Sequence, residues 1–110
     1  MEKKEQDRLV RRYYQYLKLE KALSPNTVDA YQTDLQKLLH FLEGEGIAIL
    51  DTTLDDLQHF ASGLHDIGIH PRSQARILSG IKSFFHFLVM ADYLEGDPSE
   101  LLEGPKIGFK

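Results

Sequence analysis

The chain has 110 residues, the length of one small domain, and its 42% hydrophobic content is enough for one core. It contains no cysteine, which excludes disulfide frameworks, cysteine-ligated zinc and thiol chemistry, and no apolar run approaches the roughly 20 residues that a membrane span needs. The net charge of −4 hides an uneven distribution. Residues 1–21 carry seven cations and four acids and residues 72–91 three cations and no acid, whereas 22–71 and 92–110 are acidic.

The first half of the chain predicts two long helices. Apolar residues recur at helical spacing over about 5–21 and again over about 25–43. Ser24 is a good N-cap for the second helix, and Pro25 suits its first position, where the missing N–H costs nothing. Gly44 and Gly46 end this helix. Its expected buried stripe is Val28, Tyr31, Leu35, Leu38, Leu39 and Leu42.

The second half predicts two further main helices and a short last one. Thr53 caps a third helix over about 54–65, and Pro71 opens a fourth that reaches about residue 91. Asp97 begins a capping-box-like pattern for a short fifth helix over 98–103. No segment alternates with strand period for long enough to build a sheet. The expected fold class is therefore all-α, a small bundle of four main helices plus a short fifth helix.

The fourth predicted helix has a strong amphipathic pattern. Its outward face places cations and hydroxyls at spacings of four, three and four, with Lys82 and His86 beside them. A basic, hydroxylated face without acids suits a nucleic-acid backbone or groove. The alternative is a solvated surface, although such surfaces usually mix both signs of charge. The outward row is Arg72, Arg76, Ser79 and Ser83, and the inner face is Ile77, Leu78, Ile81, Phe84, Phe85 and Leu88.

The second predicted helix carries a weaker polar face. Small polar side chains in its first turn, together with free backbone N–H groups, can bind phosphate oxygens. Taken alone, this helix favours the plainer interpretation of an N-cap followed by ordinary surface. Asp29 and Asp34 would repel a phosphate backbone if they faced it. The polar residues are Ser24, Asn26, Thr27, Thr33, Lys37 and His40.

No residue set for catalysis or metal binding is apparent. The five histidines form no HExxH or related pairing, and the sequence has no Gly-rich phosphate loop and no GxSxG. The tyrosines lie on or beside apolar stripes, where packing explains them. The sequence therefore predicts no catalytic residue, no cofactor and no metal in this chain.

Two blocks resemble the N-terminal core-binding domain of tyrosine recombinases and phage-type integrases, closest in type to the Xer group. Residues 19–42, LEKALSPNTVDAYQTDLQKLLHFL, carry the spacing Ser24-x-Asn26-Thr27-x3-Tyr31-x2-Asp34-Leu35. Residues 73–106 carry an Arg-x-Leu-Ser run, an aromatic-rich helix, an Asp-Pro turn and a Pro-Lys exit. The sequence departs from the pattern after Tyr31, where Gln32 and Thr33 stand at positions that are often basic in the Xer type.

The resemblance implies a SAM-like bundle that forms half of a C-shaped clamp around duplex DNA. Its second and fourth helices would lie toward the major groove of a recombination half-site. The positions that the resemblance marks for DNA binding are Ser24, Asn26, Thr27, Thr33, Lys37, Arg72, Ser73, Gln74, Arg76, Ser79, Lys82 and Ser83.

The resemblance also implies the context of the chain. Residues 1–104 would be the core-binding domain, and residues 105–110 the start of a linker to a catalytic domain that this chain lacks. That absent domain would supply the nucleophilic tyrosine, so this fragment itself would not be an enzyme. Expected partners are double-stranded DNA and other recombinase subunits in a tetrameric synapse, with no membrane. The expected location is the bacterial cytoplasm, at the nucleoid.

We therefore expect the DNA-binding N-terminal domain of a tyrosine recombinase or integrase. Its role would be chromosome dimer resolution or mobile-element integration by site-specific recombination. The alternative is a helical protein–protein interaction module without DNA binding, which the acidic net charge suits. Salt-sensitive binding of duplex DNA would separate the two.

Overall fold

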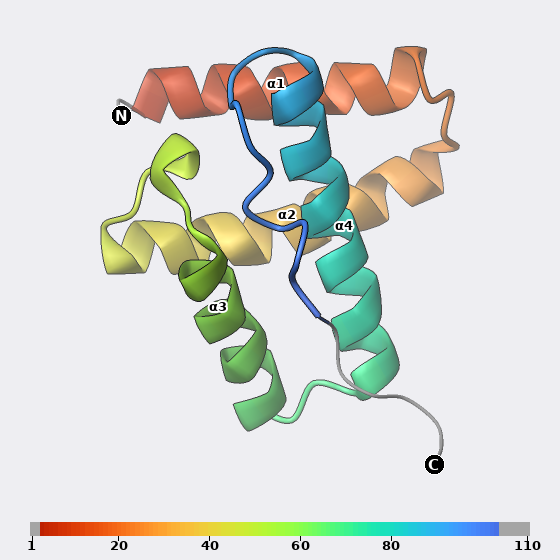
Figure 1. Cartoon of the computed structure of the whole chain (residues 1–110). Helices are drawn as coiled ribbons and strands as arrows, with labels where there is room; N and C mark the ends of the chain where they lie inside the picture. The colour runs from red at the N-terminus through yellow and green to blue at the C-terminus, as the bar shows by residue number, and fades with distance from the viewer. Residues whose placement is uncertain (1–2, 104–110) are drawn as a thin grey trace. The chain divides into compact units, whose positions relative to one another are not determined.

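The computed structural model describes residues 3–103, and the regular structure in this range is entirely helical. Four α-helices follow in chain order, α1 (Lys3–Leu19), α2 (Pro25–Glu45), α3 (Leu54–Asp66) and α4 (Pro71–Met90), with one 3₁₀ turn, η1 (Ile49–Asp51), after α2 (Figure 1). The prediction of an all-α fold with four main helices is confirmed. The chain divides into two compact units, Met1–Asp51 and Thr52–Lys110.

The first unit is a helical hairpin in which α1 packs against α2. After the turn at residues 20–24, α2 runs back in the opposite direction (Figure 1). Helix α1 ends at Leu19, two residues earlier than predicted. Ala22 explains the difference, because its φ of 52° is a left-handed conformation that a right-handed helix cannot continue. The predicted second boundary is correct, since Ser24 caps α2 and Pro25 is its first residue.

Gly46 ends α2, whereas Gly44 lies within the helix. Gly46 has a φ of 73°, and the following Ile47 N–H donates to the Leu42 carbonyl at 2.9 Å. A left-handed glycine followed by such a bond is the usual way to satisfy the last helical carbonyls. The apolar side chains buried in this unit are Leu9, Val10, Tyr13 and Leu17 of α1, Val28, Leu35, Leu38 and Leu42 of α2, and Ile49.

The second unit is the hairpin of α3 and α4. Thr53 and Asp56 form the capping box at the start of α3, where Thr53 Oγ1 accepts from the Asp56 N–H at 3.2 Å and Asp56 Oδ2 accepts from the Thr53 N–H at 2.9 Å. Gly68, with a φ of 86°, reverses the chain after α3. Pro71 opens α4 as predicted.

The apolar face of α4 is buried along its whole length. All six residues predicted for it are buried, and Phe84 and Phe85 pack edge to face with ring centroids 5.3 Å apart. Aromatic rings favour this tilted contact over a stacked one. The buried face fixes the rotation of α4 about its own axis, so the opposite face is set by the helical period.

The predicted fifth helix over 98–103 is wrong. Residues 98–101 form turns closed by bonds between residues three apart, from the Glu100 N–H to the Asp97 carbonyl and from the Leu102 N–H to the Ser99 carbonyl. Asp97 Oδ1 accepts from both the N–H and the hydroxyl of Ser99, at 2.8 and 2.6 Å. These bonds close a short turn of the kind that also caps helices, and so short a helix would not recover the cost of its nucleation.

The boundary at residue 104 and the linker expected over 105–110 lie outside the described residues. Among the described helices, none is both long and apolar enough to cross a membrane.

We expect Phe84→Ala to lower the free energy of unfolding by about 3–5 kcal/mol, the usual cost of emptying the space of a buried aromatic ring. The Phe84 ring is fully buried, at 0% exposure. Urea denaturation followed by circular dichroism measures the change. The control is Met90→Ala on the same helix, whose side chain is 50% exposed; it should change stability by no more than about 0.5 kcal/mol. A loss below about 1 kcal/mol for Phe84→Ala would contradict the packing of α4.

Candidate nucleic-acid interface

The outward face of α4 carries a row of cations and hydroxyls, which we call the α4 row. It consists of Arg72, Arg76, Ser79 and Ser83, of which the first three are exposed and Ser83 is half-buried. Lys82 lies beside the row and is also half-buried. Helix α4 contains no acid anywhere in its sequence. The row therefore presents a positive surface on which no carboxylate of its own helix would repel a phosphate group.

Arg76 and Ser83 also take part in interactions within the chain. A surface arginine that keeps one interaction still has several N–H donors, because the guanidinium group carries five in a fixed fork. Two arginines about one helical turn apart can thus bind neighbouring phosphate oxygens or the edge of a guanine.

The start of α4 is closed by a residue that the sequence analysis did not assign. His70 is the N-cap, and its Nδ1 accepts a hydrogen bond from the Arg72 N–H at 3.1 Å. Among the first three residues of α4, Pro71 has no N–H and the Arg72 N–H is bonded to His70. The Ser73 N–H is the one that neither the proline nor the cap takes away. Histidine is an uncommon cap, and no spacing pattern before α4 indicates it. The first turn of α4 accordingly offers little backbone capacity for an anion.

Gln74 is not on the surface, contrary to its predicted place in the DNA-facing set. Its side chain is 4% exposed, and Nε2 donates to the Ile69 carbonyl at 2.7 Å. The bond satisfies a carbonyl in the turn between α3 and α4. The helical period already placed Gln74 there, because it precedes the buried Ile77, Leu78 and Ile81 by three, four and seven residues.

The polar face of α2 is exposed but close to neutral. Asn26 and Thr33 are exposed and Lys37 is half-buried, and the three residues share one side of the helix. Ser24 Oγ accepts from the Thr27 N–H at 3.3 Å and lies 2.9 Å from Thr27 Oγ1. These two hydroxyls are thus already bonded to each other at the cap.

Two acids of α2, Asp29 and Asp34, would repel a phosphate backbone if they faced it, and they differ in their exposure. Asp34 is only 1% exposed and interacts within the chain, so it does not face a ligand. Asp29 is exposed, three residues after Asn26 and four before Thr33. At these spacings it shares their surface and offsets the charge of Lys37. Helix α2 is therefore suited to hydrogen bonding with a ligand rather than to electrostatic attraction.

The first unit also contains a groove of about 690 Å³ that the sequence analysis did not find. Residues of α1, α2 and the turn at 46–49 line it, and Tyr14 lies at its wall. The Tyr14 hydroxyl accepts from Gln36 Nε2 at 3.3 Å. Burial raises the pKa of Tyr14, and the hydrogen bond from Gln36 partly opposes that shift. The charged residues along the groove are of both signs, which gives it no preference for an anion or a cation: Lys3, Asp7, Arg11 and Glu43.

Comparison with known proteins assigns the chain to a family. Residues 10–92 match the family model described as "Phage integrase, N-terminal SAM-like domain". The match covers most of the chain, and the chain belongs to this family.

Several curated relatives are named tyrosine recombinases. The chain is 39% identical over 105 residues to tyrosine recombinase XerD of Staphylococcus saprophyticus, which covers 94% of the chain and 36% of that protein. It is 37% identical over 95 residues to tyrosine recombinase XerC of Oceanobacillus iheyensis, which covers 86% of the chain and 31% of that protein. It is 36% identical over 101 residues to tyrosine recombinase XerD of Proteus mirabilis, which covers 92% of the chain and 32% of that protein. The chain thus spans about a third of the length of these relatives, and the other two thirds have no counterpart in its 110 residues.

We expect Gln74→Ala to lower the free energy of unfolding by roughly 1–3 kcal/mol, because the half-buried Ile69 carbonyl loses the donor of the buried Gln74 side chain. The matched control on the same helix is Ser79→Ala, whose side chain is exposed and whose stability should change by no more than about 0.5 kcal/mol. Chemical denaturation of both variants measures the difference. Equal stabilities would mean that the bond to Ile69 contributes nothing.

Proposed function

We propose that the chain is a DNA-binding domain whose helices α2 and α4 each contact duplex DNA. The observation that carries this proposal is the α4 row, an exposed run of arginines and hydroxyls on a helix without acids. Arginine side chains supply both phosphate contacts and the commonest base-specific contact in the major groove. The proposed contact set on this helix is Arg72, Ser73, Arg76, Ser79, Lys82 and Ser83.

Helix α2 has a different role in this proposal. Its net charge is too small for strong phosphate binding, so its polar side chains would act mainly as hydrogen-bonding groups at base edges or sugar-phosphate oxygens. Asn26 is the strongest candidate, because an asparagine side chain can bond an adenine edge with both of its polar atoms. Thr33 and Lys37 would add weaker contacts, while Ser24 and Thr27 would mainly maintain the helix start.

The wider role follows from the relatives. The names of the relatives include tyrosine recombinases XerC and XerD. We propose that this domain serves site-specific recombination, with strand cleavage performed by a catalytic domain outside these 110 residues. The partners would then be duplex DNA and other recombinase subunits, assembled as a tetrameric synapse at the bacterial nucleoid.

The experiment that tests this function is an NMR titration of the isotope-labelled chain with a short DNA duplex at low salt. Amide shifts in 24–37 and 72–86 that added salt reverses would support duplex binding through these two helices. A duplex at millimolar concentration that moves no resonance would contradict DNA binding and favour a protein–protein interaction module.

We expect the double substitution Arg72→Gln and Arg76→Gln to weaken duplex binding and to flatten its salt dependence. Each phosphate contact that is lost removes about 0.9 from the slope of log K against log salt, so the slope should fall by about 1.8. Fluorescence anisotropy at several salt concentrations measures both quantities. The control, Lys3→Gln with Lys21→Gln, removes the same charge at exposed positions outside α4. Equal slopes for the two double variants would contradict a phosphate role for the α4 row.

A further inference from the structure

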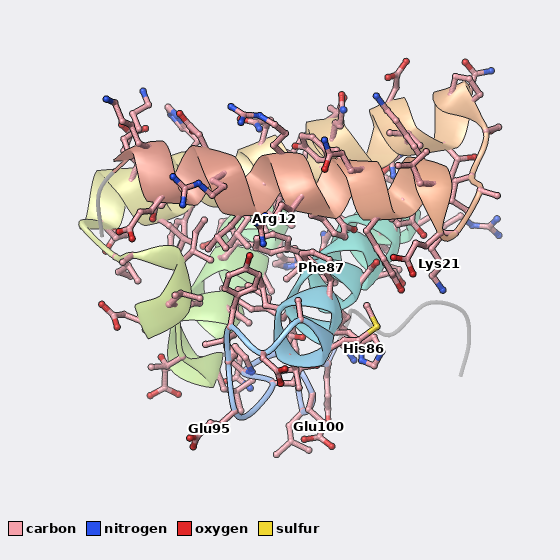
Figure 2. All side chains as sticks on the ribbon, turned by 90° about the horizontal axis from the view of Figure 1, so that it is seen from above. Arg12, Lys21, His86, Phe87, Glu95 and Glu100 are labelled. Atoms are coloured by element: carbon pink, nitrogen blue, oxygen red, sulfur yellow. The ribbon has the colours of Figure 1, made fainter. Side chains whose placement is uncertain are left out.

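Helix α1 carries a second basic row, which the proposed DNA contact set does not use. Lys4, Arg8, Arg11, Gln15 and Lys18 follow one another at spacings of four, three, four and three residues, and all five are exposed. We call this set the α1 row. Residues at these spacings share one side of a helix, so the cations form a straight line about 21 Å long. Figure 2 shows nitrogen-tipped side chains projecting along the length of α1.

The buried side of α1 fixes the direction of this row. Leu9, Val10, Tyr13 and Leu17 are buried, and the helical period places the α1 row on the opposite side. The α1 row therefore faces solvent by the same rule that orients the α4 row. Arg12 is not part of the row, because it lies close to a quarter turn away from it around the helix.

The charge of the row is of one sign. Its members are four cations and one glutamine. The acids described in α1 are Glu5 and Asp7. Glu5 lies three residues before Arg8, and Asp7 lies four residues before Arg11, so both acids neighbour the first half of the row, whereas no acid of α1 lies at such a spacing from Gln15 or Lys18. A line of four cations complements a ligand with closely and regularly spaced negative charge. Duplex DNA is such a ligand, with one charge per about 1.7 Å of its axis.

The side chains of the row favour a phosphate backbone over a protein surface. Protein interfaces depend on a few buried aromatic or aliphatic anchors. The row itself contains none, and the exposed large apolar side chain of α1 is Leu19 at the helix end, 79% exposed. Phosphate binding needs no such anchor, because charge and hydrogen bonds provide it.

We infer that the α1 row is a second binding site for the phosphate backbone of duplex DNA, separate from the α4 row. The inference rests on the proposed function, since it assigns further DNA contacts to the same domain. The bound backbone belongs either to the duplex held by α2 and α4 or to a second duplex. The chemistry is the same in both cases.

The test compares two double variants of the whole 110-residue chain. Arg8→Gln with Arg11→Gln removes two cations from the α1 row, and Lys3→Gln with Lys21→Gln removes two cations from exposed positions off the row. Figure 2 shows Lys21 beyond the end of α1. Both variants change the net charge equally, so a difference between them reports position rather than total charge. The probe is a random-sequence DNA duplex, and the readout is the slope of log K against log salt.

The double variant of Arg8 and Arg11 should flatten the slope of log K against log salt by about 1.8 more than the control variant does. Each of the two lost phosphate contacts accounts for about 0.9 of this change. A second comparison tells whether the row binds the duplex held by α2 and α4 or a second duplex. It uses two duplexes that differ by about 6 base pairs, which is the length of the row. If the flattening appears only with the longer duplex at one duplex per chain, the row binds the duplex already held. If the row variant instead loses a second equivalent of bound duplex, the row binds another molecule. Either result supports the inference.

Equal slopes for the row variant and its control would overturn the inference. The Arg72 and Arg76 variant then separates the two proposals. If that variant still flattens the slope, the proposed function stands without the α1 row. If the unmodified chain binds no duplex at low salt, both proposals fall, and an acidic protein surface becomes the better candidate ligand for the row.

Discussion

The structure of the candidate interface depends on the burial of one face of α4. Phe84, Phe85 and Leu88 are completely buried, so rotation of the helix by even a quarter turn would expose aromatic surface to water. Each such ring contributes roughly 1.5–3 kcal/mol through its burial. The position of Arg72 and Arg76 is therefore a consequence of core packing, and it needs no contact with a ligand to maintain it. A binding surface prepared in this way loses little conformational freedom when a ligand arrives.

The same rule orients three helices whose outward faces differ in chemistry. Helix α4 presents arginines and hydroxyls, α1 presents cations with acids at its flanks, and α2 presents amides and hydroxyls with Asp29 among them. Charge determines how strongly a surface attracts a phosphate backbone, whereas hydrogen-bonding geometry determines which base it prefers. In the proposed function, the described helices would separate attraction from selectivity. The basic faces of α4 and α1 would supply the first, and the nearly neutral face of α2 is suited to the second.

Helical periodicity explains why so much of this architecture follows from sequence. The caps at Ser24 and Thr53, the position of Pro71 and the buried stripe of α4 are local or periodic signals, and the structure confirms all of them. Signals that depend on a particular bond were missed. The carbonyl that Gln74 satisfies lies five residues earlier, in a turn whose shape the sequence does not specify. The capping pattern at Asp97 predicts a helix start, but the segment after it forms only turns, because so short a helix does not recover the cost of its nucleation.

The acidic net charge does not conflict with binding to DNA through these surfaces. The acidic segments act on a ligand from a distance. Salt screens charges that are more than about 10 Å apart at 0.1 M, so the repulsion by these segments weakens as salt is added. Arginines in direct contact with phosphate act over one hydrogen-bond length, and their contribution falls with added salt because each contact releases counterions from the duplex. In the proposed function, the domain would be repelled weakly from DNA at a distance and attracted at contact, which would lower its affinity for arbitrary sequence. The net charge of −4 would then favour sites where α2 adds hydrogen bonds to the contacts of α4.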